Sequence, residues 1–291
     1  MISKFFQTVL NLGKVVFKSN YFLQMEKSLD ENIVVMGNGP SLKNDIVNHL
    51  EIFKNAHLAV VNHFCLSEFF FELKPRSYFL LDPDFFTDAS GFKGNVGNTF
   101  AILTGNIEWE IDFYVPYKFR KSLLVKRLKE NSRFKVYFVN YVPAKGGFTT
   151  INHLLYNWNL ATPQCQNVLI FTLFILTRKS TKNIFLFGAE NDWHVNVIVN
   201  KDNFLELRDR HLYSENKEIK PIVLLNGNNR RTMAELLESS VKVFRAYMEL
   251  EKYAQKRNVN IYNCSGNSMI DAFERLDNEE FKQKLHESST Y

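Results

Sequence analysis

The chain has 291 residues, of which 45% are hydrophobic and 23% are charged, and its formal net charge is +5. A chain of this length and composition can bury one large core or two modest ones, as an ordinary soluble protein does. The positive charge is too small and too dispersed to indicate a nucleic-acid-binding protein. It suits anionic small molecules and an acidic membrane surface equally well.

The three cysteines, Cys65, Cys165 and Cys264, lie far apart in the sequence and form no Cys-x-x-Cys pair. Neither a zinc site nor a disulfide framework is therefore indicated. We expect the protein to work in a reducing cytoplasm.

Residues 1–28 are predicted to form an amphipathic helical segment. Lys4, Lys14 and Lys18 interrupt its apolar residues, so the segment is too broken to span a bilayer, and no small-residue cleavage site follows it. Two interpretations stay open. The segment is either a basic helix lying on an anionic membrane surface, or a helix packed on the body of the protein or on a neighbouring subunit of a homo-oligomer. We favour the packed helix.

Short apolar runs alternate with longer helical patterns along the rest of the chain. The predicted strands are Ile33–Met36, His57–Val61, Ser77–Leu81, Thr99–Leu103, Val136–Val139 and Asn183–Phe187. The predicted helices are Leu42–Leu50, Glu68–Leu73, Phe119–Lys129, Cys165–Thr177 and Thr232–Arg257, the last being a core-packing helix. This alternation predicts an α/β, Rossmann-like fold with a mostly parallel sheet and helices on both faces.

The domain organisation follows from the same pattern. We expect one α/β domain over residues 29–275 and a C-terminal tail over residues 276–291. A polar, aromatic segment at about residues 189–230 is too long to be a bare connection. It is predicted to form an irregular, lid-like excursion over a ligand site.

The first predicted strand runs directly into a turn that contains Gly37, Asn38, Gly39 and Ser41. In an open α/β sheet the first strand-to-helix turn commonly holds a phosphate or a nucleotide. The two glycines allow a tight turn, and a helix that begins near Ser41 offers free N–H groups to an anion. The pattern is neither Gly-x-Gly-x-x-Gly nor a Walker loop, so a turn without a ligand stays open as the alternative.

Polar side chains also follow the next two strands. Asn62 ends the second strand and Asp82 ends the third, so both should lie with Asn38 at one edge of the sheet. Each of them alone could simply cap a loop. The sequence Asp82-Pro83-Asp84 has a rival interpretation, because two carboxylates can hold Mg²⁺ or Mn²⁺ against a nucleotide diphosphate.

Three segments carry a resemblance to a known family. They are Gly37-Asn38-Gly39-Pro40-Ser41-Leu42-Lys43, the stretch from Lys182 to Trp193 that contains Gly188 and Glu190, and Tyr262-Asn263-Cys264-Ser265-Gly266-Asn267-Ser268. Together they resemble the bacterial sialyltransferases of glycosyltransferase family 42. The resemblance extends from Asn32 to about Phe273 and does not include the N-terminal helix.

The resemblance implies a site for a CMP-sugar donor and requires no metal or other cofactor. Asn38 and Ser41 would contact the donor, Asn62 would lie near its phosphate or sugar, and Asn267 and Ser268 near its cytidine. The implied donor-binding residues also include Gly37, Gly39, Asp82, Gln166, Asn167, Gly188, Glu190 and Arg231. Two departures from the family are compatible with a different sugar: Asp82 replaces an asparagine, and residues 163–167 replace a Thr-Ser-Gly turn.

Glycosyl transfer to a hydroxyl needs a base, and histidine has a suitable pKa near neutrality. Two histidines in the lid-like segment, His211 and His194, are candidates, and we choose His211. By resemblance, Tyr213 or Trp193 would lie beside the leaving phosphate. The pair Arg230 and Arg231 could instead neutralise that phosphate.

Three hypotheses follow. The first is an inverting glycosyltransferase that moves a CMP-activated nonulosonic acid, such as sialic acid, to a hydroxyl of a bacterial surface glycan, with a lipid-linked or lipooligosaccharide acceptor. The second is a metal-dependent transferase of the MptE-like diphosphokinases, which resemble the same Gly-x-Gly-Pro-Ser-Leu segment. The third is a non-catalytic nucleotide-sugar-binding domain. The first places the protein in the bacterial cytoplasm, either free or peripheral on the inner membrane.

Overall fold

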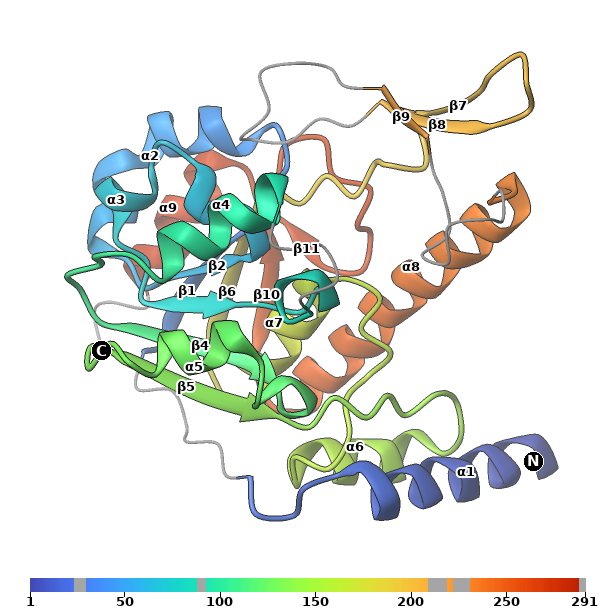
Figure 1. Ribbon diagram of the computed structural model, residues 1–291. Coiled ribbons are helices and arrows are strands. Elements are labelled where there is room, and N and C mark those ends of the chain that lie inside the picture. The colour runs from blue at the N-terminus through green and yellow to red at the C-terminus, as the bar shows by residue number, and fades with distance from the viewer. Residues whose placement is uncertain (24–29, 88–92, 209–218, 222–230, 288–291) are drawn as a thin grey trace.

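The computed structural model describes residues 1–23, 30–87, 93–208, 219–221 and 231–287. Within these ranges eight parallel strands form one sheet, in the order β11-β10-β6-β1-β2-β3-β4-β5 (Figure 1). The strands are β1 Asn32–Met36, β2 Leu58–Val61, β3 Ser77–Phe79, β4 Ile111–Pro116, β5 Phe134–Val139, β6 Asn183–Phe187, β10 Asn260–Asn263 and β11 Glu274–Arg275. The predicted α/β, Rossmann-like fold is therefore confirmed.

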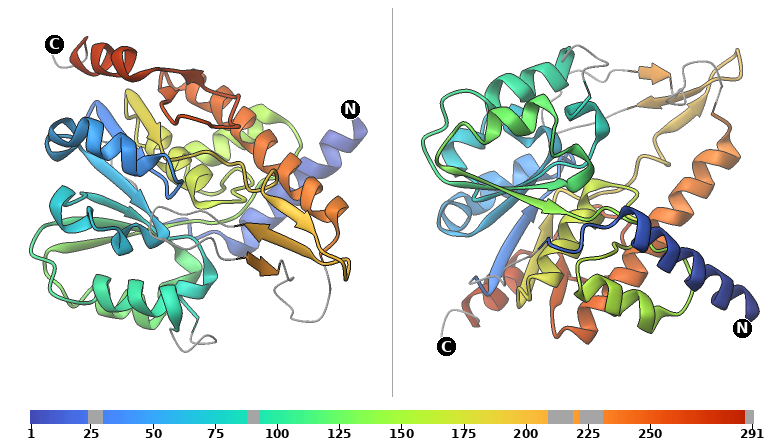
Figure 2. Two further views of the ribbon diagram at one scale, coloured as in Figure 1. Left: turned by 90° about the horizontal axis from the view of Figure 1, so that it is seen from above. Right: turned by 60° about the horizontal axis from the view of Figure 1, so that its bottom comes forward.

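Helices cover both faces of this sheet. They are α1 Ile2–Lys18, α2 Leu42–Asn55, α3 Phe70–Leu73, α4 Gly94–Leu103, α5 Leu123–Leu128, α6 Thr149–Asn157, α7 Val168–Arg178, α8 Met233–Lys256 and α9 Asn278–Glu287. Helices α2 to α5 and α9 pack on one face, while α6, α7 and α8 pack on the other. Figure 2 shows these two layers from two further directions.

Strand β1 shows why both faces are needed. Its successive side chains point to opposite sides of the sheet, so Ile33 and Val35 belong to one core while Val34 and Met36 belong to the other. All four are at most 1% exposed. A continuous apolar run is typical of a parallel strand that is buried on both faces, and this is the signal that made the strand predictable.

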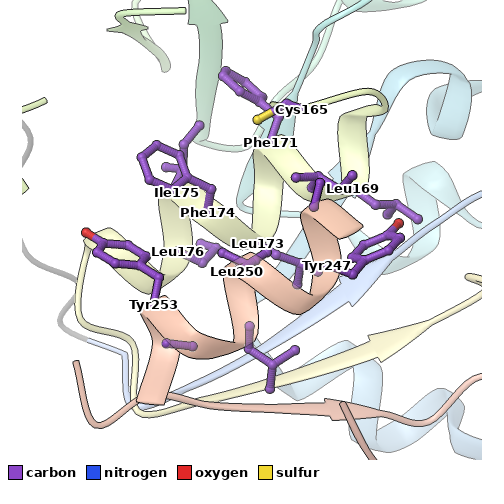
Figure 3. Packing of buried hydrophobic residues seen from close by; sticks show 14 of the residues in the cluster. Cys165, Leu169, Phe171, Leu173, Phe174, Ile175, Leu176, Tyr247, Leu250 and Tyr253 are labelled. Atoms are coloured by element: carbon purple, nitrogen blue, oxygen red, sulfur yellow. The ribbon is translucent and has the colours of Figure 1, made fainter. Parts of the chain in front are cut away.

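One of the two cores includes the contact between α7 and α8 (Figure 3). Helix α7 is apolar on all sides and each residue from Leu169 to Thr177 is buried, as expected for a helix held between a sheet and another helix. Leu250 of α8 lies against this surface, with Tyr247 and Tyr253 one turn away on either side. Helix α8 begins with a capping box formed by Thr232 and Glu235.

The strand order changes direction next to β1. From β1 the chain adds β2, β3, β4 and β5 on one side, and then returns through α6 and α7 to place β6 on the other side of β1. In an open α/β sheet, ligands bind at the carboxyl ends of the strands where the order reverses. The topology therefore directs attention to the carboxyl ends of β1 and β6.

The prediction of a strand over Thr99–Leu103 is wrong, because these residues form the last half of helix α4. A short apolar run does not distinguish a strand from a buried helical turn, and here Thr99 and Leu103, four residues apart, are the buried pair. The neighbouring strand in the sheet is instead β4, which the sequence analysis did not predict, and helices α6 and α9 were also not predicted.

The segment expected to be an irregular excursion contains regular structure. Strands β7 Val197–Val199, β8 Leu205–Arg208 and β9 Ile219–Pro221 form a small antiparallel sheet, separate from the main one (Figure 1). At the N-terminus the predicted helix is present as α1. Among the described residues, no helix is both long enough and apolar enough to cross a bilayer.

Helix α9 is an integral part of the core, since Phe281 is fully buried with its ring centroid 5.1 Å from that of Phe185 and 5.0 Å from that of Phe187. Replacing Phe281 by alanine should lower the free energy of unfolding by about 3–5 kcal/mol, because it leaves a cavity under the sheet. Urea denaturation measures this change.

The matched control is Phe17→Ala on α1, where the ring is 87% exposed. Its effect should stay within about 0.5 kcal/mol. Equal effects of the two substitutions would show that α9 does not hold the fold together.

Candidate functional site

Three turns meet at the carboxyl edge of the sheet where the strand order reverses. They follow β1 (residues 37–41), β6 (residues 188–191) and β10 (residues 264–269). The N–H of Gly37 donates to the carbonyl of Phe187 and that of Gly39 to the carbonyl of Gly188, both at 2.9 Å. The first turn is thus fastened to the β6 turn along its backbone.

This close approach requires glycine at two positions. A Cβ atom on Gly37 would lie 2.1 Å from the carbonyl oxygen of Gly188, and one on Gly39 would lie 1.4 Å from Oε2 of Glu190. The predicted importance of both glycines is therefore explained by contact with the neighbouring turn. A ligand is not needed to account for them.

Glu190 takes the position that the sequence analysis gave to an anion. Its Oε1 accepts a 2.7 Å hydrogen bond from the backbone N–H of Ser41, at the start of α2, and the residue is only 4% exposed. A carboxylate at a helix N-terminus is stabilised by the free N–H groups and the helix dipole. The backbone N–H of Ser41 is therefore not free for a phosphate, because the protein supplies its own anion there.

The Ser41 side chain does not cap α2 either. Its hydroxyl donates instead to Oδ2 of Asp45, at 3.3 Å. The pKa of the Asp45 carboxyl is raised to about 6, mainly by burial and also by the nearby Glu190 carboxylate, while the hydrogen bond from Ser41 opposes the rise. Asp45 was not among the predicted site residues.

Two asparagines tie successive strand ends together. The Nδ2 of Asn38 donates to the carbonyl of Val61 at 3.2 Å, and Oδ1 of Asn62 accepts from the N–H of Leu81 at 3.5 Å. Asn62 has a left-handed backbone, with φ of 44°, which asparagine tolerates better than most residues. The structure therefore brings Asn38 and Asn62 to one edge, as predicted, and places exposed Asp82 beside them.

Several polar atoms at this edge are buried and have no hydrogen-bond partner among the described residues. They are Oδ1 of Asn38, Oε2 of Glu190 and Nδ2 of Asn191. We call these three residues the edge cluster. Buried polar groups without partners are rare, because each costs free energy. Two free acceptors and one free donor at the reversal of strand order suit a ligand that carries hydroxyl or amino groups.

The turn after β10 packs against the β6 turn. Ser268 Oγ donates to the carbonyl of Ala189 at 2.7 Å, and the N–H of Met269 donates to the carbonyl of Glu190 at 2.7 Å. Arg275 donates to the carbonyl of Ser268 at 3.0 Å and so holds the turn. The hydroxyl of Ser268 is thus engaged by the protein, whereas the side chain of Asn267 is exposed.

A hydrogen bond to Tyr247 of α8 links the N-terminus of α7 to this region. Oδ1 of Asn167 caps α7 by accepting from the N–H of Ile170 at 2.9 Å, and its Nδ2 donates to the Tyr247 hydroxyl at 3.1 Å. Burial raises the pKa of that phenol, and the hydrogen bond with Asn167 opposes this effect. Gln166 is exposed. The sequence analysis treated Tyr247 only as a core residue and missed Asn191, although Asn191 directly follows the predicted Glu190.

Some of the catalytic candidates lie within the described residues and others lie outside them. His194 is half-buried, with its ring 5.6 Å from that of Phe244 of α8 and 5.9 Å from that of Trp193, and its Nδ1 has no partner among the described residues. Arg231 donates to the hydroxyl of Ser239. His211, Tyr213 and Arg230 lie outside the described residues, so their assignments stay predictions.

Asp82, proposed with Asp84 as a metal ligand, has a different local role in the structure. Its Oδ1 accepts a 3.1 Å bond from the N–H of Asp84 and caps a short 3-10 turn, and both residues are exposed. Over the described parts of the chain, no three or more histidine, cysteine or acidic side chains gather closely enough to hold a metal ion.

The fold and the site define a Rossmann-like α/β protein with a polar cluster at the reversal of strand order. No protein-family model matches the sequence, and no curated protein matches it. Among solved structures, the MAf glycosyltransferase from Magnetospirillum magneticum AMB-1 is similar with a TM-score of 0.45 and 11% identity, over 96% of this chain and 41% of that one. This chain therefore spans about two fifths of that structure's length. A likeness at this level carries no argument about activity, and the resemblance to the sialyltransferases stays a prediction.

Replacing Gly39 by alanine should lower the free energy of unfolding by about 2 kcal/mol or more, because the new methyl group would displace the Glu190 carboxylate. The control is Gly13→Ala on α1, where a Cβ meets nothing within 4 Å. That change should stabilise the protein by about 0.5–1 kcal/mol. Wild-type stability of Gly39→Ala in urea would contradict the proposed fit.

The raised pKa of Asp45 predicts a stability change with pH. Between the ordinary value of 3.8 and the folded value of about 6 the folded state binds the extra proton, so the free energy of unfolding should fall as pH rises through this range. Asp45 is half-buried, and solvent screening reduces the expected loss to about 1 kcal/mol. Asp45→Asn keeps an acceptor for Ser41 and should flatten the profile measured by urea denaturation. An unchanged slope would refute the assignment.

Proposed function

We propose that the protein is a glycosyltransferase that takes its sugar from a nucleotide-activated donor, namely a CMP-activated nonulosonic acid, and transfers it to a hydroxyl of a bacterial surface glycan. The observation that carries the proposal is the edge cluster. Its unpartnered atoms, from Asn38, Glu190 and Asn191, lie where Rossmann-like sheets bind nucleotides.

The chemistry of the edge cluster supports recognition of the neutral part of a donor. Glu190 already places a carboxylate on the N–H of Ser41, so a phosphate at the same helix end would meet like charge. The free Oε2 of Glu190 and Oδ1 of Asn38 instead suit a ribose hydroxyl or the cytosine amino group, both of which donate hydrogen bonds. In this proposal the donor's phosphate lies away from the start of α2.

The proposal assigns the phosphate side to the lid-like segment and the start of α8. Arg231 precedes α8, and its buried Nε has no partner among the described residues. A guanidinium can stabilise the charge that develops on a departing phosphate. His211 remains the proposed base that removes the acceptor's proton, with Tyr213 or Trp193 beside the leaving group and His194 as the second candidate.

The experiment that tests the proposal is a thermal-shift screen of the purified protein against CMP, UDP, GDP and ATP, followed by incubation with CMP-sialic acid. CMP should raise the melting temperature most, and the protein should release CMP from the donor without added metal. A chelator-sensitive reaction with ATP would instead favour the MptE-like transferase. Binding of CMP without any turnover would favour a non-catalytic domain. A protein that does not bind CMP would contradict the proposal.

The variant Glu190→Gln tests the role of the edge cluster. Glutamine keeps an oxygen for the N–H of Ser41 but loses the free carboxylate acceptor, so CMP affinity should fall about tenfold, the loss of one hydrogen bond to a charged group. Titration calorimetry measures the change.

The matched control is Glu249→Gln on α8. Glu249 is a half-buried glutamate whose Oε1 accepts from the Tyr156 hydroxyl at 3.0 Å, between α6 and α8. That substitution should leave CMP affinity unchanged. Equal losses in both variants would mean that Glu190 acts through stability alone.

A further inference from the structure

Helix α1 packs on the protein through a face that contains polar side chains, whereas a surface helix ordinarily packs through its apolar face. Its polar residues Thr8 and Asn11 are 4% and 1% exposed. Thr8 Oγ1 accepts from the N–H of Phe148 at 2.9 Å, and Oδ1 of Asn11 accepts from the N–H of Lys145 at 3.2 Å. The face that docks on the body thus carries these two polar residues together with Val15, which is 4% exposed.

The apolar face of the helix points outward. At about 100° per residue, Ile2, Phe6, Val9, Leu10 and Phe17 fall on the side opposite Thr8 and Asn11. All five are exposed, Phe6 by 62% and Phe17 by 87%. A contiguous apolar surface of this kind marks an interaction site. Figure 2 shows α1 on the outside of the body, with only one side covered.

The chain that follows α1 holds the helix in this orientation. Ser19 Oγ donates to the carbonyl of Leu160 at 2.5 Å, the N–H of Asn20 donates to Oδ1 of Asn140 at 2.9 Å, and Nδ2 of Asn159 donates to the carbonyl of Leu23 at 3.0 Å. The apolar face is therefore presented in a fixed position.

The charge of the segment indicates what covers this face. Residues 1–23 contain Lys4, Lys14 and Lys18 and no aspartate or glutamate. A second copy of the same basic segment would repel it, whereas an anionic bilayer attracts it. Tyr21 and Phe22, exposed just beyond the helix, are aromatic residues of the kind that favours the membrane interface.

We propose that the exposed face of α1 lies in the surface of an anionic phospholipid bilayer, with its apolar side chains among the acyl chains and with the positive charge of its lysines attracting the headgroups. The three lysines supply attraction and the apolar side chains supply the burial that holds the helix there. This proposal does not depend on the reaction that the edge cluster performs.

Vesicle sedimentation of the full chain tests the proposal. With vesicles of phosphatidylcholine and about 30% phosphatidylglycerol the protein should sediment, and high salt should weaken the binding because the lysine contribution is screened. Phe17→Asp should reduce the partition coefficient at least about tenfold. The double variant Lys14→Gln/Lys18→Gln should reduce it roughly fivefold per lysine on anionic vesicles only.

The matched control is Val47→Asp on α2, where valine is 62% exposed. It adds the same charge at a distant apolar site and should bind vesicles as the wild type does. Circular dichroism checks that each variant is folded. Wild-type protein that stays in the supernatant, or a Phe17→Asp variant that binds normally, would overturn the proposal. So would a dimer in sedimentation velocity that Phe17→Asp converts to a monomer, since a second copy would then occupy the face.

Discussion

The bond from the Ser41 amide to the Glu190 carboxylate is the constraint on which the rest of the site depends. It joins the turn after β1 to the turn after β6, two segments that are 149 residues apart in the chain. The contact is possible only because positions 37 and 39 carry no side chain. These bonds hold the turns after β1 and β6 against each other at the edge of the sheet. The atoms without partners, from Asn38, Glu190 and Asn191, remain as the hydrogen-bonding groups of the edge.

This constraint also determines which chemistry the edge can perform. Many Rossmann-like proteins use the first helix N-terminus to hold a phosphate, but here an internal carboxylate takes that place. The proposed donor must therefore be recognised at this edge through groups that donate hydrogen bonds, with its charge neutralised elsewhere by residues such as Arg231. If α1 also rests on an anionic membrane, the proposed enzyme would meet a lipid-linked acceptor at that surface.

Much of the fold was predictable because parallel strands buried on both faces appear as apolar runs that end in turns, as at Ile33–Met36. The same signal misled at Thr99–Leu103, where burial of one helical face gives an equally apolar run. The position of the turn after the first strand, at the carboxyl edge of the sheet, was also predictable from its two glycines. The role of Glu190 was not predictable, because no local sequence pattern connects it to Ser41. His211 and Tyr213 lie outside the described residues and stay predictions.

A crystal structure of the protein grown with CMP tests the central claim most directly. We predict CMP at the carboxyl edge between β1 and β6, with a ribose hydroxyl or the cytosine amino group donating to Oε2 of Glu190 and with the bond from Ser41 to Glu190 intact. CMP bound at another surface, or a phosphate seated on the Ser41 amide in place of Glu190, would contradict it.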